Sequence, residues 1–167
     1  MIAPGGWGVI AQPPGCLTWN SGLPEIQQSK PRLLEMGVVH RRKPNGWDWE
    51  GVPVVPYAGP GGVCGSRRVL IGPRERAPYF VIRYFELPPG CRSSLDRHSH
   101  DHGVVVLRGR AQVQLGEERF EVGPGDVIYI APHEAHQFVN IGEEPFGFLC
   151  VIPNKALLRE RRSEEGE

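Results

Sequence analysis

Between positions 66 and 155 the hydrophobic side chains fall into short segments that are typical of strands. In 111–115 the apolar residues occupy every second position, which indicates one buried and one solvent-facing side. Residues 104–107 lack this alternation, which fits a strand covered on both faces. The segments rich in β-branched and aromatic residues are 68–71, 79–87, 104–107, 111–115, 119–122, 127–130, 137–141 and 147–152. The pattern predicts an all-β domain.

Glycine- and proline-rich turns separate these segments. Pro88-Pro89-Gly90 and Gly123-Pro124-Gly125 are two of them, and such turns recur after short, regular intervals. This rhythm is typical of a closed β-sandwich or barrel. We therefore predict a barrel over residues 66–155, followed by a charged C-terminal tail at 156–167.

Residues 1–65 predict an irregular N-terminal arm, because they hold 12 of the 22 glycines and 9 of the 17 prolines. One helix is predicted at 23–36, weakened by Pro31. Trp47 and Trp49 are two positions apart, so they share one face of an extended segment. We expect that face to pack on the barrel or on a partner subunit.

Composition narrows the class of protein. The 167 residues are 40% hydrophobic and carry 19 Lys and Arg against 19 Asp and Glu, which fits one globular core. The zero net charge argues against a nucleic-acid or membrane-surface partner, and no apolar stretch is long enough to span a membrane. Residues 1–29 contain no Lys or Arg, so they do not resemble a signal peptide. We expect a cytoplasmic protein.

Four cysteines are widely spaced along the chain and form no CxxC pair: Cys16, Cys64, Cys91 and Cys150. This spacing suggests neither a structural zinc site nor a disulfide framework. We expect buried free thiols.

Histidines concentrate in one region, which favours metal binding. Five of the six fall between positions 98 and 136: His98, His100, His102, His133 and His136. Histidine is the commonest transition-metal ligand, and three at spacing two on an extended chain share one face. The cluster predicts one divalent transition metal, with Mn, Fe, Zn, Ni, Co and Cu all open.

Residues 90–109 resemble the first sequence motif of the cupin superfamily. In that motif a glycine is separated by five residues from His-x-His, and a glutamate and then a second glycine follow. Gly90, Asp96, His98, His102 and Gly109 keep this spacing. The chemistry differs at two positions, because Asp96 replaces the first histidine and His102 replaces the glutamate.

Residues 125–140 resemble the second cupin motif. Gly125 opens it, Ala131 and His133 stand at its proline and glycine positions, and His136 and Asn140 occupy its histidine and asparagine positions. The resemblance covers roughly residues 78–153. It implies a double-stranded β-helix, or jelly-roll barrel, with a metal inside that keeps open positions for water, O2 or substrate.

A second alignment of the first motif resembles small four-histidine cupins. There His98 and His100 form the pair and His102 follows as the third ligand. His98, His102 and His136 are candidate ligands in both alignments. His100 and Asp96 compete for the fourth place, and we favour His100 because the similar family uses nitrogen-rich sets.

The resemblance implies several functions. A metal-dependent oxidoreductase of the dioxygenase type, acting on a small organic molecule, comes first. The alternatives are a cupin that binds a metal or small ligand without turnover, and a non-oxidative lyase or isomerase. Asp96, Glu86 or Glu134 could serve as an outer base. Exposed sheet edges and the paired tryptophans suggest a homodimer, as in other small cupins.

Aromatic side chains are expected to line the substrate pocket. The candidates are Tyr79, Tyr84 or Phe85, Tyr129, Phe138 and Phe148. Such a lining would favour a small aromatic or enol-type substrate over a sugar phosphate.

Overall fold

The computed structural model describes residues 37–154, which form an all-β structure. Alternating burial along the strands, such as that of Val127–Ile130, follows the sequence pattern. Within the described part no helix has the length and hydropathy of a membrane span. The strands are β1 (Val55–Gly59), β2 (Val63–Ile71), β3 (Phe80–Leu87), β4 (His102–Arg108), β5 (Ala111–Leu115), β6 (Glu118–Val122), β7 (Val127–Ile130), β8 (His136–Asn140) and β9 (Phe146–Pro153).

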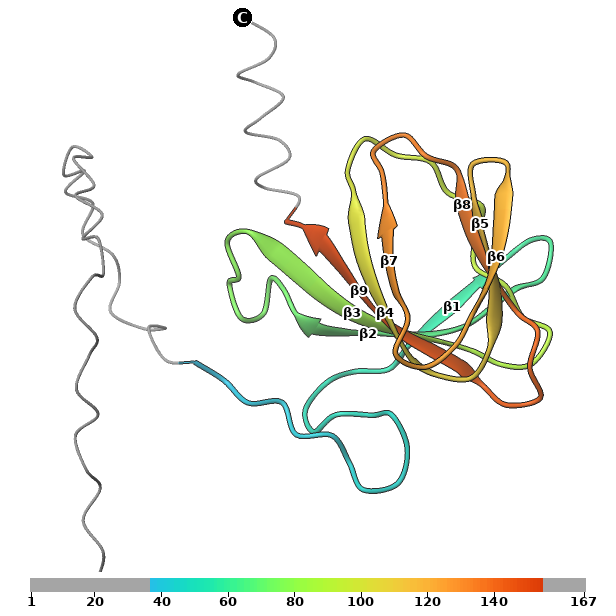
Figure 1. Cartoon of the computed structure of the whole chain (residues 1–167). Helices are drawn as coiled ribbons and strands as arrows, with labels where there is room; N and C mark the ends of the chain where they lie inside the picture. Colours follow the sequence, from blue (N-terminus) through green and yellow to red (C-terminus); the bar gives the residue numbers. More distant parts are fainter. Residues whose placement is uncertain (1–36, 155–167) are drawn as a thin grey trace, which may run out of the picture. The chain divides into compact units, whose positions relative to one another are not determined.

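The strands form two antiparallel sheets (Figure 1). The larger sheet has the order β1-β2-β3-β9-β4-β7, and the smaller has the order β6-β5-β8. The larger of two hydrophobic clusters in the described residues lines the interior, with Leu87, Val104, Val113 and Phe146 almost fully buried. The expected all-β jelly-roll barrel is confirmed.

The predicted arm contributes to the barrel. β1 lies wholly within residues 1–65, and the predicted boundary at residue 65 falls inside β2. β1 pairs with β2 from Val55 opposite Arg67 to Gly59 opposite Val63. The helix predicted at 23–36 and the tail at 156–167 lie outside the described residues.

The paired tryptophans pack on the outer face of the larger sheet. The rings of Trp47 and Trp49 lie 5.6 and 5.2 Å from that of Tyr84, which is fully buried on β3. Asp48 accepts hydrogen bonds from Arg68 on β2 at 2.7 and 2.9 Å. The expected packing of this segment on the barrel is confirmed, and the tryptophans no longer argue for a partner subunit.

Two of the cysteines form a disulfide, so the expectation of four free thiols is wrong. Cys64 on β2 is bonded to Cys91, which follows β3. The sequence spacing gave no hint of this pair, because the two residues meet only where the segment after β3 returns beside β2, at the bridge between Val63 and Arg92. Cys150 is a free, buried thiol, and Cys16 lies outside the described residues.

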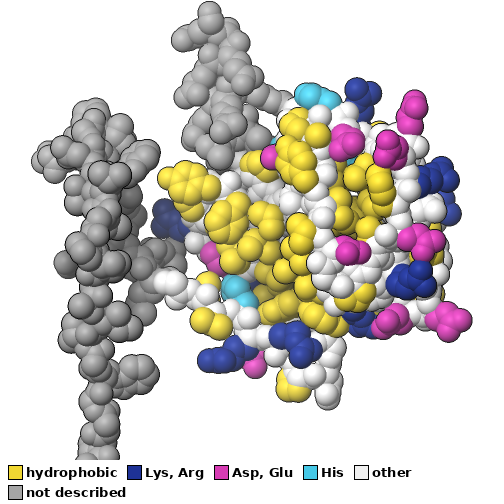
Figure 2. Space-filling view, viewed as in Figure 1, with side chains coloured by type: hydrophobic (Ala, Val, Ile, Leu, Met, Phe, Trp, Pro, Cys, Tyr) yellow, Lys and Arg dark blue, Asp and Glu magenta, His cyan; other side chains and the backbone are white. Residues whose placement is uncertain are grey.

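An edge of the larger sheet exposes apolar side chains. Val127 and Tyr129 on β7 are 76% and 64% exposed, and hydrophobic side chains gather over this part of the face in Figure 2. β7 is the last strand of its sheet and has unpaired backbone groups on its outer side. The homodimer stays a prediction, and this edge is where a second chain could pair.

The turn that precedes β8 contains a strained residue. His133 stands at the cupin glycine position and has a φ of 64°. Its backbone N–H donates to the carbonyl oxygen of His98 at 2.7 Å, which holds the turn beside the histidine cluster. The side chain itself is exposed.

A pair of substitutions tests this strain. Because a left-handed backbone disfavours residues that carry a Cβ, we expect His133→Gly to be more stable than His133→Ala by about 1 kcal/mol. Urea unfolding of both variants measures the difference. Equal free energies of unfolding would show that this turn is not strained.

Candidate metal centre

Three of the predicted ligands meet inside the barrel. His102 is the first residue of β4 and His136 the first of β8, so the two sheets bring them together from opposite sides. His98 lies in the loop before β4. One nitrogen from each of the three rings lies within 4.8 Å of the others. Three converging imidazoles are a donor set that transition metals prefer.

Hydrogen bonds orient two of these rings. The Nδ1 of His98 donates to the carbonyl oxygen of His100 at 3.2 Å, and the Nδ1 of His136 donates to that of Glu134 at 2.9 Å. A carbonyl can only accept, so in the neutral ring the proton is on Nδ1. Each Nε2 therefore keeps a free lone pair, the form in which histidine binds a metal.

His102 is buried without a partner for one nitrogen. Its Nδ1 lies 3.6 Å from the Sγ of Cys150, and its buried Nε2 contacts no hydrogen-bonding group in the described structure. Burial, followed by the nearby His98 ring, lowers the pKa of His102 to about 3. The ring is thus neutral at physiological pH. An unsatisfied buried nitrogen is costly unless something binds it, which fits a metal at this position.

His100 stays a predicted fourth ligand. Its ring stacks on that of His98 with centroids 3.9 Å apart, outside the three-nitrogen cluster. Burial and the His98 ring lower its pKa to about 4, so it too is neutral at physiological pH. It lines the same pocket as the three clustered rings.

Asp96, the alternative to His100, is held beside the cluster. Its backbone exchanges two hydrogen bonds with that of His136, at 2.9 and 3.0 Å. Its carboxylate accepts a hydrogen bond from the Ser94 hydroxyl at 2.8 Å. Tyr57 in turn donates to the Ser94 oxygen at 2.6 Å, since that hydroxyl's own proton points to Asp96.

The other two candidate bases lie away from the pocket. Glu86 accepts a hydrogen bond from the Tyr84 hydroxyl at 3.0 Å on the outer face of β3. Glu134 accepts one from the backbone of Ala131 at 3.0 Å. Of the described residues that line the pocket, only Asp96 carries a carboxylate.

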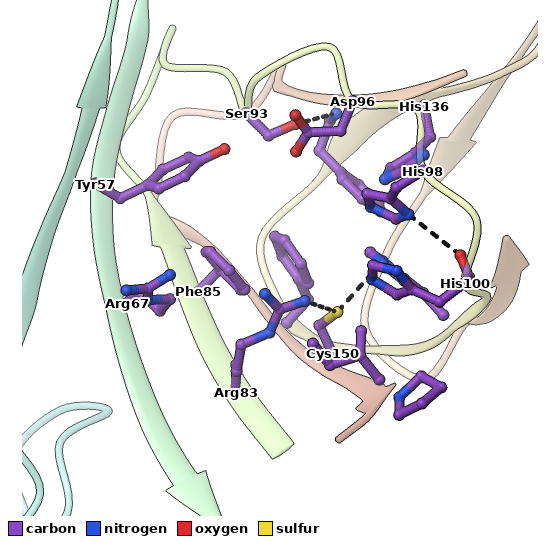
Figure 3. Close-up of a pocket in the computed structure, with 15 residues that line it drawn as sticks. Tyr57, Arg67, Arg83, Phe85, Ser93, Asp96, His98, His100, His136 and Cys150 are labelled. Atoms are coloured by element: carbon purple, nitrogen blue, oxygen red, sulfur yellow. Dashed lines mark hydrogen bonds between the residues drawn. The ribbon is translucent and has the colours of Figure 1, made fainter. Parts of the chain in front are cut away.

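The histidine cluster opens into a cavity of about 280 Å³. Phe85, Phe138 and Phe148 line it as expected. The expectation is wrong for Tyr79 and Tyr129, which are 68% and 64% exposed. The lining residues are Tyr57, Arg67, Arg83, Phe85, Ser93, Asp96, His98, His100, His102, His136, Phe138, Phe148, Cys150, Ile152 and Pro153 (Figure 3).

Sequence reasoning missed the two arginines of this cavity. Arg67 lies on β2 opposite Phe85, and Arg83 lies on β3 two positions before Phe85, so all three face inward. The signal was present in the alternation of β3, where Arg83 is in phase with Phe85 and Leu87. A charged residue in the buried phase of a strand marks a candidate binding group.

Comparisons with known proteins agree with this architecture. The cupin domain family model matches residues 83–152. Over 107 residues the chain is 36% identical to 1-methylthio-D-xylulose 5-phosphate methylsulfurylase of Rhodospirillum rubrum, covering 62% of this chain and 67% of that protein. Over 80 residues it is 49% identical to glucose-6-phosphate isomerase of Thermococcus kodakarensis, covering 47% of this chain and 39% of that enzyme.

A solved structure shows the same fold along most of the described chain. It is a cupin 2 conserved barrel domain protein from Rhodopseudomonas palustris, with 35% sequence identity and a TM-score of 0.62. The match covers 70% of this chain and 80% of that one. Together with the two motifs and the convergent histidines, these matches show that the chain belongs to the cupin family.

Proposed function

We propose that this cupin is a metal-dependent enzyme that acts without O2 on a small molecule with a carbonyl group and neighbouring hydroxyls. The observation that carries the proposal is the convergence of His98, His102 and His136 in the wall of an open cavity. The unsatisfied Nε2 of His102 supports a bound ion at this point. The reaction class is that of an isomerase or lyase.

The chain's own groups suit proton transfer. A divalent metal held by the three histidines would supply Lewis-acid polarisation of a substrate oxygen. The Asp96 carboxylate lines the cavity and can accept a proton from a substrate carbon or hydroxyl. The hydrogen bonds from Tyr57 to Ser94 and from Ser94 to Asp96 hold that carboxylate in place.

The similar enzymes favour non-oxidative chemistry. By their names, one is a methylsulfurylase acting on a phosphorylated xylulose derivative and the other isomerises glucose 6-phosphate. Neither name describes an oxidase or oxygenase. We therefore rank the isomerase or lyase reading above the dioxygenase reading.

One experiment separates the functional classes. We expect protein purified without added metal to contain close to one transition-metal ion per chain by elemental analysis. We expect it to convert short aldoses, ketoses or their phosphates without O2 uptake, and a chelator to stop the reaction. O2 consumption in step with substrate loss would establish a dioxygenase instead. Bound metal with no turnover across this panel would favour a binding protein.

A further inference from the structure

Two arginines share the inner face of the larger sheet. Arg67 on β2 is opposite Phe85 on β3, while Arg83 on β3 is opposite Val69 on β2 and Cys150 on β9. Arg67 and Arg83 are therefore diagonal neighbours on adjacent strands, and both line the cavity. Figure 3 shows Arg67 across the cavity from His98 and His136, with Arg83 between the two sides.

Neither guanidinium is neutralised. Within residues 37–154 no carboxylate forms an ion pair with Arg67 or Arg83, and the Nε of each is buried without a partner. Arg83 donates only to the Cys150 sulfur, at 3.1 Å, and its guanidinium lies 5.1 Å from the Phe85 ring centroid. Both arginines are partly buried, and a buried Nε without a partner is costly unless an anion binds the guanidinium.

We propose that Arg67 and Arg83 bind the phosphate group of a phosphomonoester substrate. Two uncompensated guanidinium groups match the double charge of a phosphate, and their fork-shaped donors match its oxygens. Asp96, the one carboxylate among the described residues of the cavity wall, already accepts a hydrogen bond from the Ser94 hydroxyl. Arg67 lies across the cavity from His98 and His136 (Figure 3), whereas Arg83 donates to Cys150, whose sulfur lies 3.6 Å from the Nδ1 of His102. The phosphate is therefore placed at the Arg67 end of the cavity, with Arg83 reaching it from the side of the histidines.

This placement orients the rest of the molecule. Phe85 and Phe148 stack with ring centroids 5.4 Å apart and follow Arg67 across the sheet toward β4, where His102 lies. A short carbon chain can lie over these rings, with its phosphate at the arginines and its carbonyl at the histidines. The substrate class is thus a small sugar or polyol phosphate, in place of the aromatic or enol compounds that the sequence favoured. This inference rests on the proposed function in one respect only, which is the position of the substrate's carbonyl end at the metal centre.

Calorimetric titration of the full chain with inorganic phosphate, at constant ionic strength, tests the arginines directly. We expect Arg67→Gln and Arg83→Gln each to weaken phosphate binding by about tenfold or more. Arg67→Lys and Arg83→Lys should retain part of the affinity for phosphate, because lysine keeps the positive charge. They should not retain all of it, because lysine lacks the forked pair of guanidinium donors. The matched control is Arg119→Gln, which removes an exposed charge on β6 and should bind phosphate like the wild type.

Titration with acetate separates the two kinds of anion. Acetate should bind at least about tenfold more weakly than phosphate, because it carries one charge. Acetate binding as tight as phosphate binding would overturn the phosphomonoester assignment. Glutamine variants that keep their melting temperature and bind phosphate like Arg119→Gln would overturn the role of the arginines.

Metal content, measured on the same samples, keeps this test apart from that of the metal centre. The arginine variants should keep their metal while losing phosphate affinity. His102→Ala should lose metal while still binding phosphate. If the wild-type protein contains no metal, the proposed catalytic function fails, and the phosphate titration still decides the role of the arginines.

Discussion

Replacement of His102 by alanine is expected to remove the bound metal. His102 is 7% exposed, its Nε2 is buried without a partner, and one of its ring nitrogens lies within 4.8 Å of a nitrogen of each of the other two clustered histidines. Loss of a group that only orients a ligand typically costs 10–100-fold in metal affinity, so loss of a ligand should cost about 100-fold or more. The affinity can be measured by competition with a chelator, and the content by elemental analysis. His136→Ala should give the same result.

The control for this prediction is another histidine of the same region. His133 has an exposed side chain, and His133→Gly suits the positive φ of that position. This variant should keep the wild-type metal content. If His102→Ala and His136→Ala both bind metal as the wild type does, the three-histidine centre is assigned to the wrong residues.

Loss of the Cys64–Cys91 disulfide is expected to lower the stability of the chain by several kcal/mol. The bond joins residues 27 positions apart. Closing a loop of that length lowers the entropy of the unfolded chain, which corresponds to about 3–4 kcal/mol. We expect the double variant Cys64→Ser, Cys91→Ser to lose about 3.5 kcal/mol of free energy of unfolding in urea titrations.

A reducing agent provides the matched measurement. Dithiothreitol should lower the stability of the wild-type chain to that of the double variant, and should leave the double variant unchanged. Peptide mapping without reduction should recover Cys64 and Cys91 in one linked fragment. A wild-type protein that yields both as free thiols and is insensitive to dithiothreitol would contradict the pairing.

Local patterns explain why the strands and the histidines could be predicted. The alternation in Ala111–Leu115 and the glycines that follow several strands, such as Gly109, Gly116 and Gly123, depend on near neighbours, so they can be recognised in the sequence. The cupin motif requires a glycine at position 109 because the φ of Gly109 is 70° and a Cβ there would lie 2.6 Å from the carbonyl oxygen of Pro145. Asn140 is a second such position, because its buried amide donates to the backbone of Leu87 and Glu144.

Features that depend on pairing between distant strands could not be predicted. Cys64 meets Cys91 only because the segment after β3 returns beside β2, where Val63 bridges Arg92. A shift of the pairing of β2 with β3 by one residue would turn Arg67 away from the cavity. The residue type of Tyr79 and Tyr129 favours an inward position, but Tyr79 precedes β3 and Tyr129 lies on the exposed face of β7. Residue type alone does not say which face of a strand is covered.

The sequence by itself determined the all-β class, the cupin resemblance and three histidines of the metal centre. These follow from periodicity and spacing within short segments, which local backbone geometry controls. The tertiary structure alone decided that the three rings converge, that Cys64 and Cys91 are bonded, and that Arg67 and Arg83 face the same cavity. Those relations depend on strand register and on the packing of one sheet against the other, because only these bring distant side chains to one point.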